Sequence, residues 1–178
     1  MSDIADTLFP KPTEEQLRVR FAEALAEISF TPADLLKWMD DRGDYRDGSA
    51  TIRSIRRMLS GETRVSGEML VLVNMLLRQH RRLKLKYPNL AWEKNEYGDY
   101  STRVDSWYVY ISPKTRGRWL LSCSSGPLRE DYSPEWGRWL DSLDEAKNKA
   151  LMTVEEGMAD MAENLFNNSR YAREVASS

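Results

Sequence analysis

Three arginines, Arg53, Arg56 and Arg57, lie within five positions of one another in the segment SATIRSIRRMLS, residues 49–60. A guanidinium group keeps its charge at ordinary pH and presents a planar set of N–H donors, which suits phosphate oxygens and the edges of bases. The same segment contains no Asp or Glu. A helix surface that only faces water usually mixes charges of both signs, so this segment favours contact with a nucleic acid.

The apolar residues around these arginines have the spacing of a helix. Ile52, Ile55 and Leu59 fall on one side and are predicted to face the core. The opposite side carries small and basic residues: Ala50, Arg53, Ser54 and Arg57. Arg56 lies at the margin of the apolar side, where its stem can extend the charge outward. Small side chains between cations let a helix approach a duplex closely, so we expect a DNA recognition helix that ends near Gly61.

Three further helices are predicted in the first half of the chain. Thr13 is expected to cap the first and Thr31 the second, which has Pro32 at its first position, where the missing N–H costs nothing. Asp47 or Ser49 would cap the basic helix, after the loop of residues 40–49, and a longer apolar helix would begin after residue 66. The acidic loop itself is interpreted as flexible. We therefore expect an N-terminal four-helix bundle.

Residues 13–80 resemble the Cro/repressor (XRE-type) helix-turn-helix family, with FTPADLLKWMD as its second helix and SATIRSIRRMLSGETRVSGEMLVLVNML as its recognition helix, loop and closing helix. The chain departs from the family in the longer turn DRGDYRDG and in Pro32, which replaces a polar residue that helps to hold a phosphate. The resemblance implies phosphate contact by Arg64. It also implies base contacts by Ala50, Thr51, Arg53, Ser54 and Arg57.

Charge is distributed unevenly along the chain. The protein has a formal net charge of -2, yet residues 53–86 hold nine Lys and Arg against two Glu. The helix tail RQHRRLKLK within this block is a candidate second patch of backbone contacts, since each neutralised phosphate adds to affinity. The alternative is that these cations only complement the C-terminus of a helix. The expected phosphate-contacting residues are Arg56, Arg64, Arg81, Arg82 and Lys84.

The second half of the chain has a different pattern. Pro88 ends the helical region, and runs of alternating aromatic and β-branched residues follow it. Strands are expected within residues 90–94, 100–104, 106–112 and 118–124, a loop over 124–137, and a last helix capped by Ser142 with Glu145 in a capping box. The predicted class is α+β, with a helix-turn-helix domain over 1–88. A small antiparallel sheet packed on one long helix would form a second domain over 89–178.

The aromatic residues of this half have two interpretations. Trp107 alternates with Tyr108 and Tyr110, and four more tryptophans are nearby: Trp92, Trp119, Trp136 and Trp139. Exposed aromatic rings on a sheet could stack unpaired bases. We favour the other interpretation, a core between the sheet and the helix, because aromatic residues are what a domain of this size has available to fill one.

Several classes of function find no support. The chain has one cysteine, Cys123, and one histidine, His80, so that no disulfide and no Cys/His metal cluster can form within it. No Gly-rich phosphate loop and no Gly-x-Ser-x-Gly motif occurs, so we expect neither an enzyme nor a cofactor. Cys123 is interpreted as a small apolar filler. Without a signal-like start or a membrane-length apolar run, the protein is expected to be cytoplasmic.

These observations predict a sequence-specific double-stranded DNA-binding transcriptional regulator of phage, plasmid or bacterial origin. Such proteins commonly pair two recognition helices about 34 Å apart, so a homodimer is expected, with residues 90–166 carrying at least part of its contact. The alternative is a protein-binding adaptor or inhibitor of a mobile element that retains a helix-turn-helix scaffold and binds a protein partner through its second half.

Overall fold

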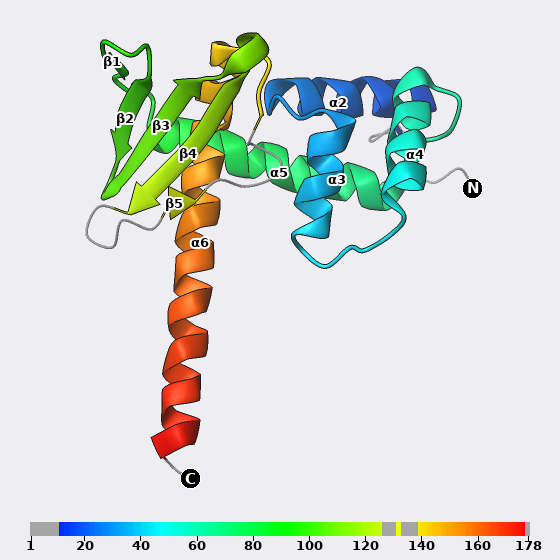
Figure 1. Cartoon of the computed structure of the whole chain (residues 1–178). Helices are drawn as coiled ribbons and strands as arrows, with labels where there is room; N and C mark the ends of the chain where they lie inside the picture. Colours follow the sequence, from blue (N-terminus) through cyan, green and yellow to red (C-terminus); the bar gives the residue numbers. More distant parts are fainter. Residues whose placement is uncertain (1–10, 126–130, 133–138, 177–178) are drawn as a thin grey trace. The chain divides into compact units, whose positions relative to one another are not determined.

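A computed structural model describes residues 11–125, 131, 132 and 139–176, and it describes side chains for residues 11–125 and 139–166. The protein is α+β, with five α-helices in the described residues and one five-stranded antiparallel sheet (Figure 1). The chain divides into two compact units between Arg78 and Gln79. This division falls inside a helix, whereas the domain boundary predicted after residue 88 lies two residues past the end of that helix at Lys86.

The first unit is helical. Its helices are α2 (Glu14–Glu27), α3 (Pro32–Asp40), α4 (Gly48–Ser60) and the first part of α5 (Gly67–Lys86). α4 packs against both α2 and α3. Every one of these helices places apolar side chains in the core: Phe21, Leu25, Leu35, Met39, Ile55, Met58, Met69 and Val73.

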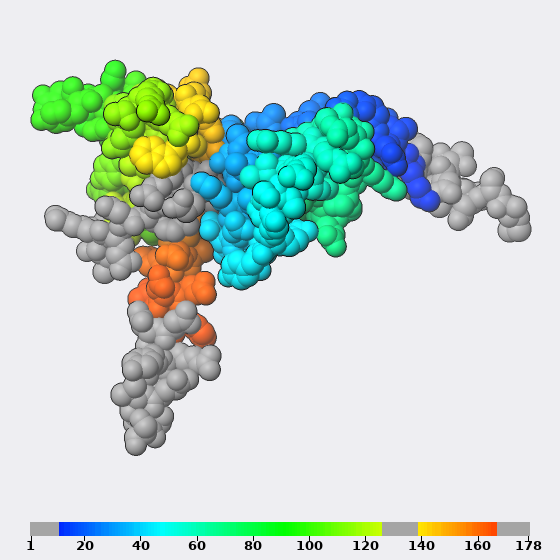
Figure 2. Space-filling model, turned by 45° about the vertical axis from the view of Figure 1, so that its right-hand side comes forward, coloured from blue at the N-terminus to red at the C-terminus, as the bar shows by residue number. Residues whose placement is uncertain are grey.

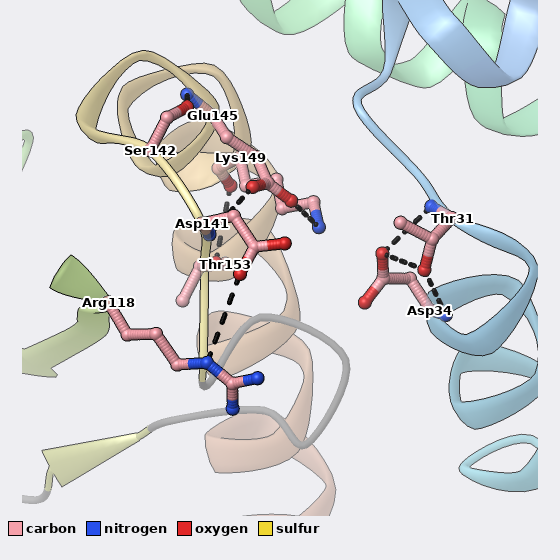
Figure 3. Close-up of polar contacts among 8 residues, drawn as sticks. All are labelled: Thr31, Asp34, Arg118, Asp141, Ser142, Glu145, Lys149 and Thr153. Atoms are coloured by element: carbon pink, nitrogen blue, oxygen red, sulfur yellow. Dashed lines mark hydrogen bonds and ion pairs between the residues drawn. The ribbon is translucent and has the colours of Figure 1, made fainter. Parts of the chain in front are cut away.

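The helix starts follow the predicted caps. The Thr13 hydroxyl accepts from the Gln16 backbone N–H at 3.2 Å, and the Gln16 side chain accepts from the Thr13 N–H at 2.9 Å. Thr31 and Asp34 form the same reciprocal pair at the start of α3, with distances of 2.8 and 3.2 Å (Figure 3). Pro32 is the first residue of α3, as predicted. These bonds satisfy backbone donors that the helices leave unpaired.

The second unit is built on the sheet. Its strands are β1 (Glu93–Lys94), β2 (Tyr100–Val104), β3 (Trp107–Pro113), β4 (Trp119–Ser125) and β5 (Asp131–Tyr132), paired in sequence order. Val109 of β3 lies opposite Thr102 and Cys123. Alternate residues therefore share a face, and the inward face of β3 and β4 carries Trp107, Val109, Ile111, Leu121 and Cys123, all buried. A short 3-10 turn, η1 (Thr115–Gly117), joins these two strands.

One long helix, α6 (Leu143–Ala176), packs on β3 and β4. The Ser142 hydroxyl accepts from the Glu145 backbone N–H at 3.0 Å, which confirms the predicted cap. The Glu145 carboxylate accepts from the Asp141 backbone N–H, one residue before the expected donor, and from the buried Lys149 ammonium at 2.9 Å (Figure 3). The Cys123 thiol lies 3.6 Å from the Thr153 carbonyl oxygen and is fully buried, as expected of an apolar filler.

Two features of this unit differ from the sequence prediction. β5 lies within residues 124–137, which were predicted to be a loop; the remaining residues of that segment from 126 on lie outside the described residues. Only two residues of β5 pair with β4, so the segment is too short to show a period-2 pattern. β1 is likewise limited to the last two residues of the predicted strand 90–94. No helix in the described part of the chain is long and apolar enough to span a membrane.

Candidate nucleic-acid interface

Local bonds fix both ends of α4. The Asp47 carboxylate accepts from the backbone N–H groups of Ser49 at 2.8 Å and Ala50 at 3.1 Å, so Asp47 is the cap of the two candidates. The Ser49 hydroxyl also donates to this carboxylate. The bond from the hydroxyl, followed by the two backbone bonds, lowers the pKa of Asp47. At the other end Gly61 takes a left-handed conformation, with φ of 83°, that ends the helix where the sequence predicted.

The buried side of α4 is rotated from the predicted one. Ile55 is fully buried, as expected, but its buried neighbours are Thr51 and Met58, while Ile52 and Leu59 are only half-buried. The predicted apolar set assumed that the most hydrophobic residues lie deepest. The residues of α4 that are buried instead form the row Thr51, Ile55 and Met58, and α3 and α2 pack against this helix. Thr51, with 9% of its surface exposed, is therefore a poor base-contacting residue, and we remove it from that set.

The remaining predicted base-contacting residues lie together on the exposed side. Ala50, Arg53, Ser54 and Arg57 are all exposed, and Arg56 is exposed as well. Ala50 and Ser54 line a depression of about 480 Å³ beside the helix. Figure 2 shows the surface formed by residues 41–64, coloured cyan to blue-green. The exposed side thus combines long cations with small residues that leave room for close approach.

The arginines of this surface differ in their electrostatic partners. No carboxylate of the described residues lies within ion-pair distance of Arg53 or Arg56. Arg57 lies 3.5 Å from Glu62 and Arg64 lies 3.5 Å from Glu14, with all four side chains more than half exposed. Ion pairs as exposed as these contribute little free energy. A phosphate group could therefore replace either carboxylate at small cost.

Part of the negative charge of the loop between α3 and α4 is neutralised within the loop itself. Arg46 forms an ion pair with Asp44, which lowers the pKa of Asp44 and raises that of Arg46. The Arg42 guanidinium stacks 3.7 Å above the Trp38 ring and donates to the Trp38 carbonyl oxygen at 3.2 Å. Both arginines of this loop are therefore engaged in local contacts.

Arg46 is a candidate contact residue that the sequence did not single out. It is 58% exposed and lines the same depression as Ala50 and Ser54. The sequence feature that could have identified Arg46 as a contact residue is its position directly before the basic helix. The four aspartates of the loop obscured it, because nothing in the sequence shows which of them pairs with Arg46.

The other predicted phosphate contacts belong to the second unit. Arg81, Arg82 and Lys84 are exposed on α5. The Arg82 guanidinium donates to Glu155 at 2.7 Å, and Glu155 also accepts from Gln79. Arg82 therefore has a carboxylate partner within the second unit, and all three residues belong to a different unit from α4.

The aromatic residues of the sheet divide between core and surface. Trp107 is buried, which confirms the core interpretation for that residue, but Trp139 is 51% exposed and Trp92 and Trp119 are half-buried. Trp136 lies outside the described residues. Tyr108 and Tyr110 face outward, with ring centroids 6.4 Å apart, and Arg103 lies 5.6 Å from the Tyr108 ring.

Among the described residues no group of three or more His, Cys, Asp or Glu side chains could hold a metal ion. No protein-family model matches the chain, and neither a curated protein nor a solved structure matches it. The arrangement of the side chains is therefore the basis for the proposal that follows.

Proposed function

We propose that the protein is a sequence-specific double-stranded DNA-binding transcriptional regulator in which α3 and α4 form a helix-turn-helix and α4 is the recognition helix. The observation that carries this proposal is the exposed side of α4, where Arg53 and Arg56 have no ion-pair partner among the described residues. α4 itself has no carboxylate, so its three exposed arginines repel one another. The nearby charges of Asp47 at Arg53 and of the exposed Glu62 at Arg57 offset part of this repulsion, and a bound anion would offset the rest. DNA is the anion that a helix of this shape fits.

The roles within α4 follow from position. Arg53 and Arg57 are one helical turn apart, so both can reach base edges in the same groove. Ala50, before them, and Ser54, between them, are the small residues that allow close approach. Arg56 and Arg64 extend from the edges of this surface toward phosphates. Arg46 is added to the phosphate-contacting set for its exposure beside the helix. α2 to α5 would form the four-helix bundle that holds α4.

Binding of this kind needs neither a catalytic group nor a cofactor. We further propose that the regulator acts as a homodimer, because one recognition helix reads only one half-site. Arg81, Arg82 and Lys84 remain candidates for additional phosphate contacts. A phage, plasmid or bacterial origin follows only from the family resemblance of residues 13–80.

The test is a salt titration of the full chain on random duplex DNA, followed by selection of the sequences that bind. The logarithm of the binding constant should fall linearly with that of salt concentration, by about 0.9 for each phosphate contacted. The selected sequences should share a motif. Arg64→Ala should weaken binding to all sequences alike. Failure of the parent to bind any duplex at low salt would contradict the proposal and favour the protein-binding adaptor.

A further inference from the structure

The last described part of α6 extends beyond the sheet. Ala146, Ala150 and Thr153 are fully buried where the helix packs on β3 and β4. Beyond Gly157 the exposure rises, and Leu165 and Phe166 are 57% and 65% exposed. Figure 1 shows this part of α6, in orange, continuing past the end of the sheet. Leu165 is thus a large apolar side chain that remains exposed on this part of α6.

These side chains form a narrow stripe. Met158, Met161 and Leu165, called the α6 stripe here, continue the row of the buried Val154 at spacings of four, three and four residues. This is the alternation of a coiled-coil seam. Met158 and Met161 are half-buried and Leu165 is exposed, so the seam opens progressively toward the C-terminal end.

The charges of the helix lie away from the stripe. At 100° per residue Glu156, Asp160 and Glu163 fall on the opposite side. Glu155 lies at the flank of the stripe, where it accepts hydrogen bonds from Arg82 and Gln79. The positions that flank the stripe within this stretch are mostly small or uncharged: Gly157, Ala162 and Asn164. Two such helices could approach closely along the stripe without placing carboxylates against each other.

We propose that the α6 stripe packs against the same stripe of a second copy of the chain and forms the homodimer contact. A single helix with no packing partner is only marginally stable in water, so association would stabilise this part of α6. The proposal deepens the function proposed above, which expects a dimer, by naming its contact surface. It does not depend on DNA binding.

The charges also decide against other occupants. Residues 150–166 contain four Asp and Glu and no Lys or Arg. An anionic surface, whether a lipid headgroup layer or a nucleic acid, would be repelled by this stretch. A second copy meets no such penalty, because the acidic side of each helix faces water in the pair.

The test is sedimentation of the full-length chain at tens of micromolar, in the absence of DNA, with Met161→Glu, Leu165→Glu and the matched control Ala159→Glu. Ala159 is exposed and points away from the stripe, so the control adds the same carboxylate to the same helix. The parent and Ala159→Glu should be dimers. Each stripe variant should weaken the dimer at least about tenfold, because an unpaired charge would be buried in the seam.

A monomeric parent, or stripe variants that dimerise as tightly as the parent, would overturn the proposal. Circular dichroism should show the same thermal midpoint for the monomeric forms of Leu165→Glu and Ala159→Glu, because both positions are exposed in the single chain. DNA titration of the same proteins separates the two proposals. A dimer that binds no DNA would contradict the proposed DNA binding and leave the α6 contact standing. A monomer that binds DNA would contradict the α6 contact and the proposed homodimer, but not the DNA binding.

Discussion

Arg18 of α2 donates from Nη1 to the backbone carbonyl oxygen of Leu59 at 3.2 Å and thereby joins α2 to the last turn of α4. Glu15 holds the guanidinium in place through a second bond at 2.8 Å to Nε. The stem of Arg18 also lies against Gly61, where an added Cβ would meet the Arg18 Cδ at 3.3 Å. One side chain therefore satisfies an unpaired carbonyl at the C-terminal end of the proposed recognition helix.

Arg18→Met should loosen the last turn of α4, because the methionine keeps the apolar stem but donates no hydrogen bond. Amide hydrogen exchange of residues 57–61 should become faster than in the parent, while exchange in α3 stays the same. Arg20→Met, an exposed residue of the same helix, is the control. Equal exchange rates in parent and variant would show that this bond does not hold the helix end.

Ile55→Ala should reduce the free energy of unfolding of the first unit by about 2–5 kcal/mol, since Ile55 is fully buried and the truncation leaves a cavity. Arg56→Ala, at the next position but exposed, should change it by no more than about 0.5 kcal/mol. Urea denaturation of both variants measures the difference. Similar losses for the two would mean that the faces of α4 are assigned incorrectly.

Stability should fall in acid partly because of Asp47. Its hydrogen bonds from Ser49 and Ala50 lower its pKa in the folded state below its ordinary value. This contribution is present above the unfolded pKa, near about 3.9, and is lost as pH falls through the folded pKa. The thermal midpoint of Asp47→Asn should therefore fall less steeply than that of the parent below pH 4, because asparagine caps a helix without titrating. Parallel curves would contradict the capping role.

Asp44→Asn should release Arg46 for phosphate contact. The variant should bind random duplex more tightly at low salt, and its salt slope should steepen by about 1. Asp47→Asn in the same background should tighten binding further by removing a carboxylate beside the basic helix. Adding Arg46→Ala to Asp44→Asn should return the slope to that of the parent. A slope unaffected by Asp44→Asn would remove Arg46 from the proposed interface.

Local features of this fold could be predicted from the sequence. Thr13, Thr31 and Ser142 cap the helices predicted for them, because a cap depends on residues only two or three positions away. The central strands follow from period-2 alternation, and β3 departs from its predicted range by only one residue at each end. Elements with strong local patterns were therefore predictable.

Features that depend on partners distant in sequence could not be predicted. Helical periodicity locates an apolar side of α4 only to within about one residue, and the neighbouring helices decide that Thr51 and Met58 are buried in place of Ile52 and Leu59. β5 exists through its pairing with β4. The partner of Arg46 likewise required the loop conformation, since four aspartates compete for it.

The most direct test of the central claim is the affinity of Arg53→Ala and Arg57→Ala for a duplex selected by the parent protein, measured by fluorescence anisotropy at fixed salt. Each variant should lose about 1–3 kcal/mol of specific binding free energy and show relaxed base preference. The control is Arg118→Ala, which removes the same charge from the second unit and should bind like the parent. If both helix variants bound the selected duplex as tightly and as selectively as the parent, α4 would not be the recognition helix.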